Sequence, residues 1–119
     1  MSELTSEEWE DFGKIEKILE QICENSFNTT MFNVCFLMNN AYKDGIIPNV
    51  HCQFIPRYDK EVKLFDKEYV DKHFRYNFWK WDLNESESQK DIFTKEERLQ
   101  IFNIMKEEYN RILLSKELL

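Results

Sequence analysis

Apolar residues recur at helical spacing in the first part of the chain, directly after a polar start signal. Thr5 and Glu8 stand three residues apart, the spacing of a capping box that satisfies two backbone N–H groups of a helix start. The apolar positions that follow are Trp9, Phe12, Ile15, Ile18, Leu19, Ile22 and Cys23. Steps of three and four residues place such side chains on one helix face. We therefore predict a helix from Ser6 to about Glu24, followed by a polar connector over residues 25–30.

Two later stretches alternate apolar and polar side chains, which is typical of β-strands. In residues 31–38, one face carries Phe32, Val34, Phe36 and Met38. In residues 49–57, the polar face consists of Asn49, His51 and Gln53, and the apolar face of Val50, Cys52 and Phe54. A loop over residues 39–48 separates the two strands and allows them to pair antiparallel. Such pairing would bring Asn33 within reach of the polar face that carries His51.

The second half of the chain is less regular until a final helix. Residues 57–63 are highly charged, and we expect them to leave the sheet. Aromatic residues cluster between Phe65 and Trp81, and a polar loop is predicted at about residues 84–92. Thr94 and Glu97 form a second capping-box pattern, which opens a predicted helix at about residues 95–116. Its apolar stripe consists of Leu99, Phe102, Met105, Tyr109, Ile112 and Leu113. We expect both helices to bury their stripes in the core.

Length and composition favour one folded domain spanning residues 1–119. Hydrophobic residues make up 42% and charged residues 33%, a balance typical of globular proteins. Helices combined with a small antiparallel sheet predict an α+β fold. The net charge of −7 disfavours nucleic acid as a partner. Because no run of about 18 apolar residues occurs, we expect no membrane span.

The cysteines and histidines limit the possible chemistry. The three cysteines are Cys23, Cys35 and Cys52, an odd number without the spacing of a zinc motif, so we interpret them as buried thiols. With neither a disulfide framework nor a secretory signal, we expect a cytoplasmic protein. The two histidines, His51 and His73, have no Cys or acid at ligand spacing, so we expect no metal site.

The residues around the second strand resemble the histidine-triad (HIT) family, and most closely its diadenosine tetraphosphate hydrolase-like members. The family motif is His-x-His-x-His followed by two apolar residues and often Pro-Arg. This chain has Asn49, His51 and Gln53 in those places, followed by Phe54-Ile55-Pro56-Arg57. The upstream run from Met38 to Gly45 is also similar, and the resemblance covers about residues 3 to 70.

The resemblance implies a HIT-like half-barrel, here incomplete, and a homodimer. It implies that His51 is the nucleophile that attacks the α-phosphorus of a nucleotide. Gln53 stands where hydrolases carry the third histidine; the transferase branch has Gln there, and an amide can donate to a phosphate oxygen. Asn49 and Asn33 would be further polar partners of the phosphate or sugar, and no cofactor is implied.

The sequence is compatible with two functions. The first is a hydrolase that acts on dinucleoside polyphosphates or nucleoside phosphoramidates. The second is a catalytically silent HIT-like binding or assembly module, because Asn49 cannot take the role of the family's first histidine. The family's N-terminal hairpin also has no counterpart before Thr5. Without the resemblance, His51 is most simply a structural histidine on a strand.

Overall fold

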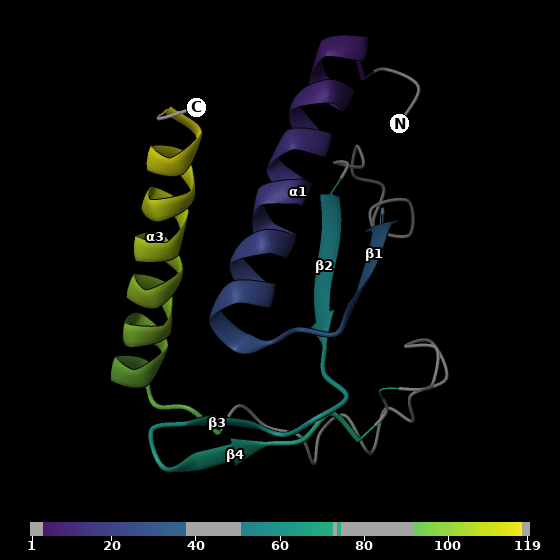
Figure 1. The fold of residues 1–119 in the computed structure, drawn as a ribbon. Coiled ribbons are helices and arrows are strands. Elements are labelled where there is room, and N and C mark those ends of the chain that lie inside the picture. The colour runs from purple at the N-terminus through teal and green to yellow at the C-terminus, as the bar shows by residue number, and fades with distance from the viewer. Residues whose placement is uncertain (1–3, 38–50, 73, 75–91, 118–119) are drawn as a thin grey trace.

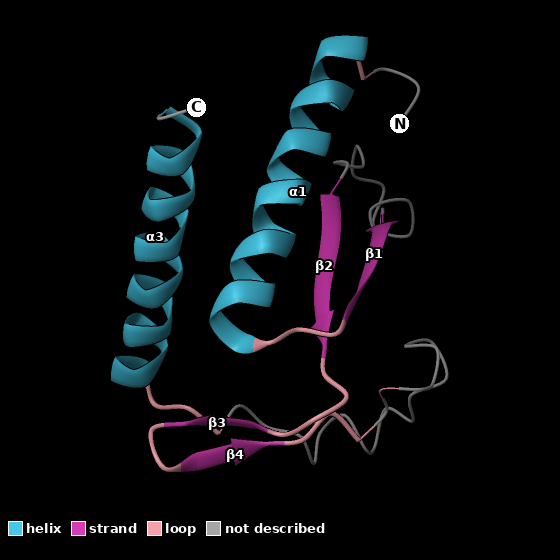
Figure 2. Cartoon of the chain, in the orientation of Figure 1, coloured by secondary structure: helices cyan, strands magenta, loops and turns pink. Residues whose placement is uncertain are grey.

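The computed structural model describes residues 4–37, 51–72, 74 and 92–117, and in these residues the chain has an α+β fold (Figure 1). The described residues form two helices and two antiparallel sheets of two strands each (Figure 2). In chain order the elements are α1 (Ser6–Phe27), β1 (Met31–Leu37), β2 (His51–Arg57), β3 (Val62–Leu64), β4 (Lys67–Tyr69) and α3 (Lys95–Glu117). Helix α1 lies between α3 and the β1–β2 sheet. The predicted fold class is confirmed.

Local hydrogen bonds fix both ends of α1. The backbone N–H of Glu8 donates to Thr5 Oγ1 at 3.1 Å, and the N–H of Thr5 donates to Glu8 Oε2 at 2.7 Å, which confirms the predicted capping box. The helix continues past the predicted end to Phe27, so residues 25–27 are helical rather than part of the connector. It stops at Asn28, which adopts a left-handed conformation (φ 55°) and donates its N–H to carbonyls of the last turn.

Strands β1 and β2 pair antiparallel, as predicted. Asn33 lies opposite Ile55, and Leu37 lies opposite His51. Residues 38, 49 and 50 and the loop over 39–48, all part of the predictions, lie outside the described residues.

One face of this sheet packs on α1. The ring of Phe36 lies with its centroid 5.6 Å from that of Trp9 and 5.2 Å from that of Phe12. On the same face, Phe32 stacks on Phe54 at 5.0 Å. Because side chains alternate along a strand, the polar residues point to the other face, away from α1. The predicted division of the two strands into an apolar and a polar face is therefore confirmed for the described residues.

Strands β3 and β4 form a short hairpin that we did not predict from the sequence. Its two connecting residues, Phe65 and Asp66, have φ angles of 54° and 59°, a conformation usually adopted by Asn or Gly. The Phe65 ring packs edge-to-face on Phe93 with centroids 6.1 Å apart. Lys67 Nζ donates to the Ile92 carbonyl at 2.9 Å. These contacts attach the hairpin to the chain that enters α3.

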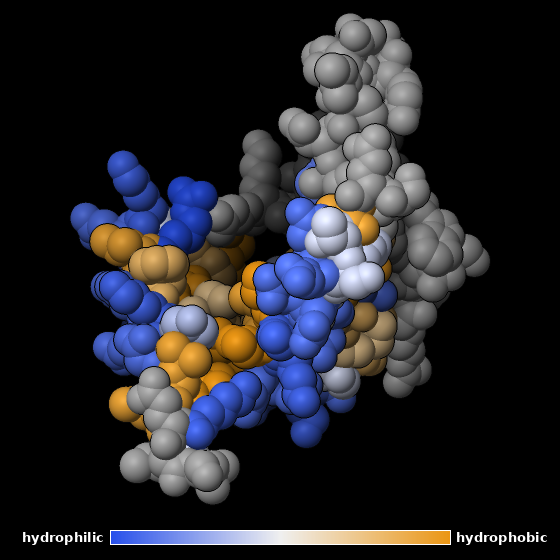
Figure 3. Space-filling view, turned by 90° about the horizontal axis from the view of Figure 1, so that it is seen from above, coloured by the Kyte–Doolittle hydropathy of each residue, from blue (hydrophilic) through white to orange (hydrophobic). Residues whose placement is uncertain are grey.

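Helix α3 begins at the predicted capping box, but its apolar stripe is not a core stripe. The Glu97 N–H donates to Thr94 Oγ1 at 3.1 Å, which confirms the box. Of the α3 side chains described, Ile112 alone is fully buried, whereas Leu99 and Phe102 are 60% and 58% exposed. The prediction that α3 buries its whole stripe is wrong, because α1 covers only one side of the helix. Figure 3 shows apolar side chains on α3 and in the hollow between α3 and α1.

Candidate functional site

His51 and Gln53 lie on the polar face of the sheet, on alternate positions of β2. His51 is half-buried at the first residue of the strand, and Gln53 is exposed opposite Cys35 of β1. The neighbouring residue Cys52 points the other way, toward α1, where it lines a small pocket with Phe12 and Leu19. The α1 side of the sheet is therefore filled by apolar packing, and the polar face is where a ligand could approach His51.

A buried ion pair lies at the opposite end of the same face. Arg57 Nε donates to Asp71 Oδ2 at 2.6 Å and Arg57 Nη2 donates to Asp71 Oδ1 at 3.0 Å, while the two side chains are only 1% and 3% exposed. Arg57 Nη1 donates to Asn33 Oδ1 at 2.8 Å, and the Tyr58 N–H donates to Asp71 at 3.3 Å. This cluster links β1, β2 and the residues after β4.

The cluster differs from the sequence-based predictions in two respects, the position of Arg57 and the presence of Asp71. Arg57 does not leave the sheet with the charged stretch that follows it; it is buried because Asp71 neutralises its guanidinium in bidentate geometry. Asp71 was not among the predicted site residues. It lies just beyond a hairpin that the sequence did not predict, so no sequence signal brought it next to Arg57.

The structure does not bring all the predicted site residues together. Asn33 pairs with Ile55, which lies four residues along β2 from His51, or about 13 Å at the usual rise of a strand. Its amide oxygen is held by Arg57. Asn33 and His51 therefore share a face but cannot contact the same phosphate group. Asn49 and His73 lie outside the described residues.

Two tyrosines lie near the ion-pair cluster. The rings of Tyr58 and Tyr69 meet edge-to-face with centroids 6.0 Å apart. Burial raises the pKa of both phenols, and the negative charge of Asp71 raises both pKa values further. The positive charge of Arg57 partly opposes this increase in the pKa of Tyr69. Both hydroxyls therefore stay protonated at neutral pH.

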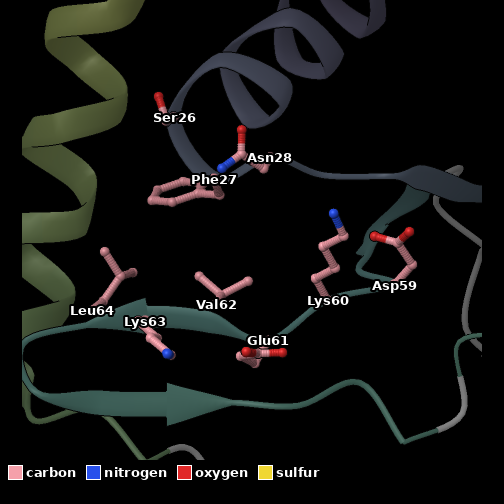
Figure 4. A pocket seen from close by; sticks show the side chains of 9 residues that line it. All are labelled: Ser26, Phe27, Asn28, Asp59, Lys60, Glu61, Val62, Lys63 and Leu64. Carbon is pink, nitrogen blue, oxygen red and sulfur yellow. The ribbon is translucent and has the colours of Figure 1, made fainter.

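A separate polar pocket lies between the end of α1 and the start of the β3–β4 hairpin (Figure 4). It has a volume of about 440 Å³, and its polar lining residues are Ser26, Asn28, Asp59, Lys60, Glu61 and Lys63. His51, Gln53 and Asn33 are not among the residues that line it. Two acids offset its two lysines, and a helix C-terminus carries partial negative charge. A phosphate group would therefore gain little electrostatic stabilisation in this pocket.

The thiols and acids give no sign of a metal centre in the described part of the chain. Cys23, Cys35 and Cys52 are all free thiols, of which Cys23 is buried and the other two are half-buried. The prediction of buried thiols thus holds fully for Cys23 alone. No group of three or more His, Cys, Asp or Glu side chains is arranged to hold a metal ion among the residues described.

Neither described helix is long and apolar enough to cross a membrane. Comparisons of this chain with protein-family models, with curated proteins and with solved structures found no match.

Proposed function

We propose that this protein binds a nucleotide on the polar face of the β1–β2 sheet, as a homodimer in the cytoplasm, and cleaves it at the α-phosphate through His51. The observation that carries the proposal is the alternation along β2, which places the half-buried His51 and the exposed Gln53 on one face. The free thiols of all three cysteines suit a reducing compartment.

The proposed reaction has two steps. An imidazole nitrogen of His51 attacks the α-phosphorus, an N–P bond forms, and the P–O bond to the leaving group breaks with its electron pair on oxygen. Water then attacks the phosphorus and releases a proton to solvent, the N–P bond breaks with its electron pair on the His51 nitrogen, and a nucleoside monophosphate leaves. The Gln53 amide donates to a non-bridging phosphate oxygen during both steps.

The chemistry of Gln53 favours one substrate class over the other. An amide cannot transfer a proton to the leaving group as an acid does. A polyphosphate leaves as a stable anion, whereas the amine of a phosphoramidate must be protonated as it departs. We therefore propose dinucleoside polyphosphates as the preferred substrates.

The ion-pair cluster has a supporting role in this proposal. Arg57 is enclosed by Asp71 and Asn33 at the far end of β2, so it is not offered to a phosphate. By fixing the relative position of β1 and β2, the cluster keeps the polar face in register. Asn33 is accordingly a positioning residue, and the first contacts to phosphate are assigned to His51 and Gln53.

The test compares the wild type with His51→Ala and with Gln21→Ala, an exposed polar residue of α1 as a matched control. Release of nucleoside monophosphate from a dinucleoside polyphosphate is measured by chromatography. We expect His51→Ala to abolish turnover and Gln21→Ala to retain it. Absence of turnover by the wild type, or full turnover by His51→Ala, contradicts the enzymatic proposal.

The second candidate is a catalytically silent binding module. It is favoured by Asn49, which stands where the HIT motif has its first histidine. It predicts that AMP binds without any hydrolysis of a dinucleotide. Calorimetric titration of the wild type with AMP distinguishes the cases, because heat of binding without turnover supports the module. If no heat is released at millimolar AMP, both nucleotide hypotheses fail.

A further inference from the structure

Helix α3 carries a row of side chains at alternating steps of three and four residues, all of them exposed except the half-buried Leu113. The row consists of Leu99, Phe102, Lys106, Tyr109 and Leu113. Leu99, Phe102 and Tyr109 are 60%, 58% and 40% exposed, so the row runs beside the contact with α1 rather than within it. This 3-4-3-4 spacing is the a/d pattern of a helix that packs along another helix. We call these five residues the α3 seam.

The α3 seam borders an apolar groove between the two helices. The groove has a volume of about 530 Å³, and its walls include Ile18 and Leu19 of α1 and Phe102, Met105 and Tyr109 of α3. Ile15 on the α1 side is 58% exposed. Figure 3 looks onto this hollow and shows apolar surface continuing from its floor onto α3. A groove of this composition favours the apolar face of a further helix.

Charge limits which helix can occupy the groove. Residues 95–117 of α3 contain five basic and five acidic side chains, whereas α1 has seven acidic and two basic ones. Of the two described helices of this acidic chain, α3 is therefore the one that can meet its own copy without net repulsion. Antiparallel packing places the partly positive N-terminal end of each α3 beside the partly negative C-terminal end of the other, whereas the two Lys106 ammonium groups meet at the middle of the seam.

We propose that the groove is occupied by α3 of a second copy of this chain, packed antiparallel along the α3 seam. Phe102 and Tyr109 of each copy then pack against the groove of the other copy. The two α1–α3 pairs together form a four-helix interface. This interface rests on the homodimer of the proposed function and assigns the α3 seam as its contact surface. It is tested by association, whereas the proposed activity is tested by turnover, so the two failures are distinguishable.

The first test is disruption of the seam. Molar mass of the full chain is measured by light scattering across a dilution series for the wild type, Phe102→Glu and Leu114→Glu. Leu114 lies on α3 but off the seam. It is 60% exposed, close to the 58% of Phe102, and its change to Glu adds the same charge, so Leu114→Glu is the matched control. We expect Phe102→Glu to raise the dimer dissociation constant by at least about tenfold and Leu114→Glu to leave it unchanged. Circular dichroism checks that both variants are folded.

The second test strengthens the seam and does not depend on loss of association. Lys106→Leu removes the one charge from the apolar row, and Gln100→Leu makes an equally apolar change at an exposed position off the row. We expect Lys106→Leu alone to lower the dissociation constant. A wild type that stays monomeric at millimolar concentration overturns the proposal, as does an equal effect of Phe102→Glu and Leu114→Glu. Either result would leave the groove to a helix of another protein.

Discussion

Arg57 and Asp71 form a bidentate ion pair in which both side chains are almost completely buried, with 1% and 3% of their surface exposed. The pair joins the end of β2 to the chain that follows β4, and Asn33 of β1 accepts a further hydrogen bond from Arg57. Removing two charges from water is costly, so such a pair is maintained only when its geometry and hydrogen bonds are nearly complete. It therefore holds the chain that follows β4 against the end of β2.

Asp71→Ala should strongly destabilise the protein, because it leaves the Arg57 guanidinium buried without its counter-charge. We expect the free energy of unfolding, measured by urea denaturation, to fall by about 3–5 kcal/mol. The matched control is Glu10→Ala, which removes an acid from an ion pair with Lys14 whose side chains are 66% and 69% exposed. That variant should unfold at the wild-type urea concentration. A similar loss in both variants would show that burial of the Arg57–Asp71 pair has no special effect.

The parts of the fold that the sequence predicts are those determined by neighbouring residues. The capping boxes at Thr5 and Thr94 need only a partner three residues away, and both form. The two faces of β1 and β2 follow from strict alternation, which is also how the placement of His51 and Gln53 on one face could be predicted.

The rest depends on contacts between distant residues. The β3–β4 strands are three residues long and are joined by Phe65-Asp66 rather than by a glycine turn, so no strong hairpin signal exists. Without that hairpin, Asp71 cannot be placed beside Arg57. Helical periodicity likewise identifies an apolar face on α3 but not what covers it, which is why the exposure of Phe102 was not predicted.

Asp66→Gly should stabilise the hairpin, because Asp66 holds a left-handed φ of 59° that glycine adopts without steric cost. We expect a gain of about 0.5–1 kcal/mol in the free energy of unfolding, after the entropy cost of glycine. The control, Glu68→Gly, changes an exposed β4 residue in extended conformation and should lose a similar amount. If Asp66→Gly loses stability as Glu68→Gly does, the turn is not strained at this residue.

The stability of the protein should decrease in alkaline solution. Burial raises the pKa of the Cys23 thiol from 9.0 to about 11. Between these values the unfolded chain releases the thiol proton and the folded chain keeps it, so the free energy of unfolding falls as pH rises from about 9 to 11. Burial raises the pKa values of Tyr58 and Tyr69 as well, which adds to the effect at higher pH.

Urea denaturation at pH 8, 9 and 10 measures this decrease, and Cys23→Ala isolates the share of the thiol. The variant is expected to be less stable at pH 8, because it loses a buried side chain, but to lose less further stability between pH 8 and 10. Parallel curves for the wild type and Cys23→Ala would contradict the assignment to Cys23.

Gln53→Glu should weaken nucleotide binding without affecting the fold. Gln53 is exposed on the polar face of β2, so a carboxylate fits there, but it would replace an N–H donor by a negative charge beside the proposed phosphate position. We expect the dissociation constant for AMP, measured by calorimetry, to rise at least about tenfold. Gln21→Glu on α1 adds the same charge to the whole protein at an exposed position of the helix, so it controls for long-range repulsion. Equal weakening by the two variants would mean that the phosphate does not lie against Gln53.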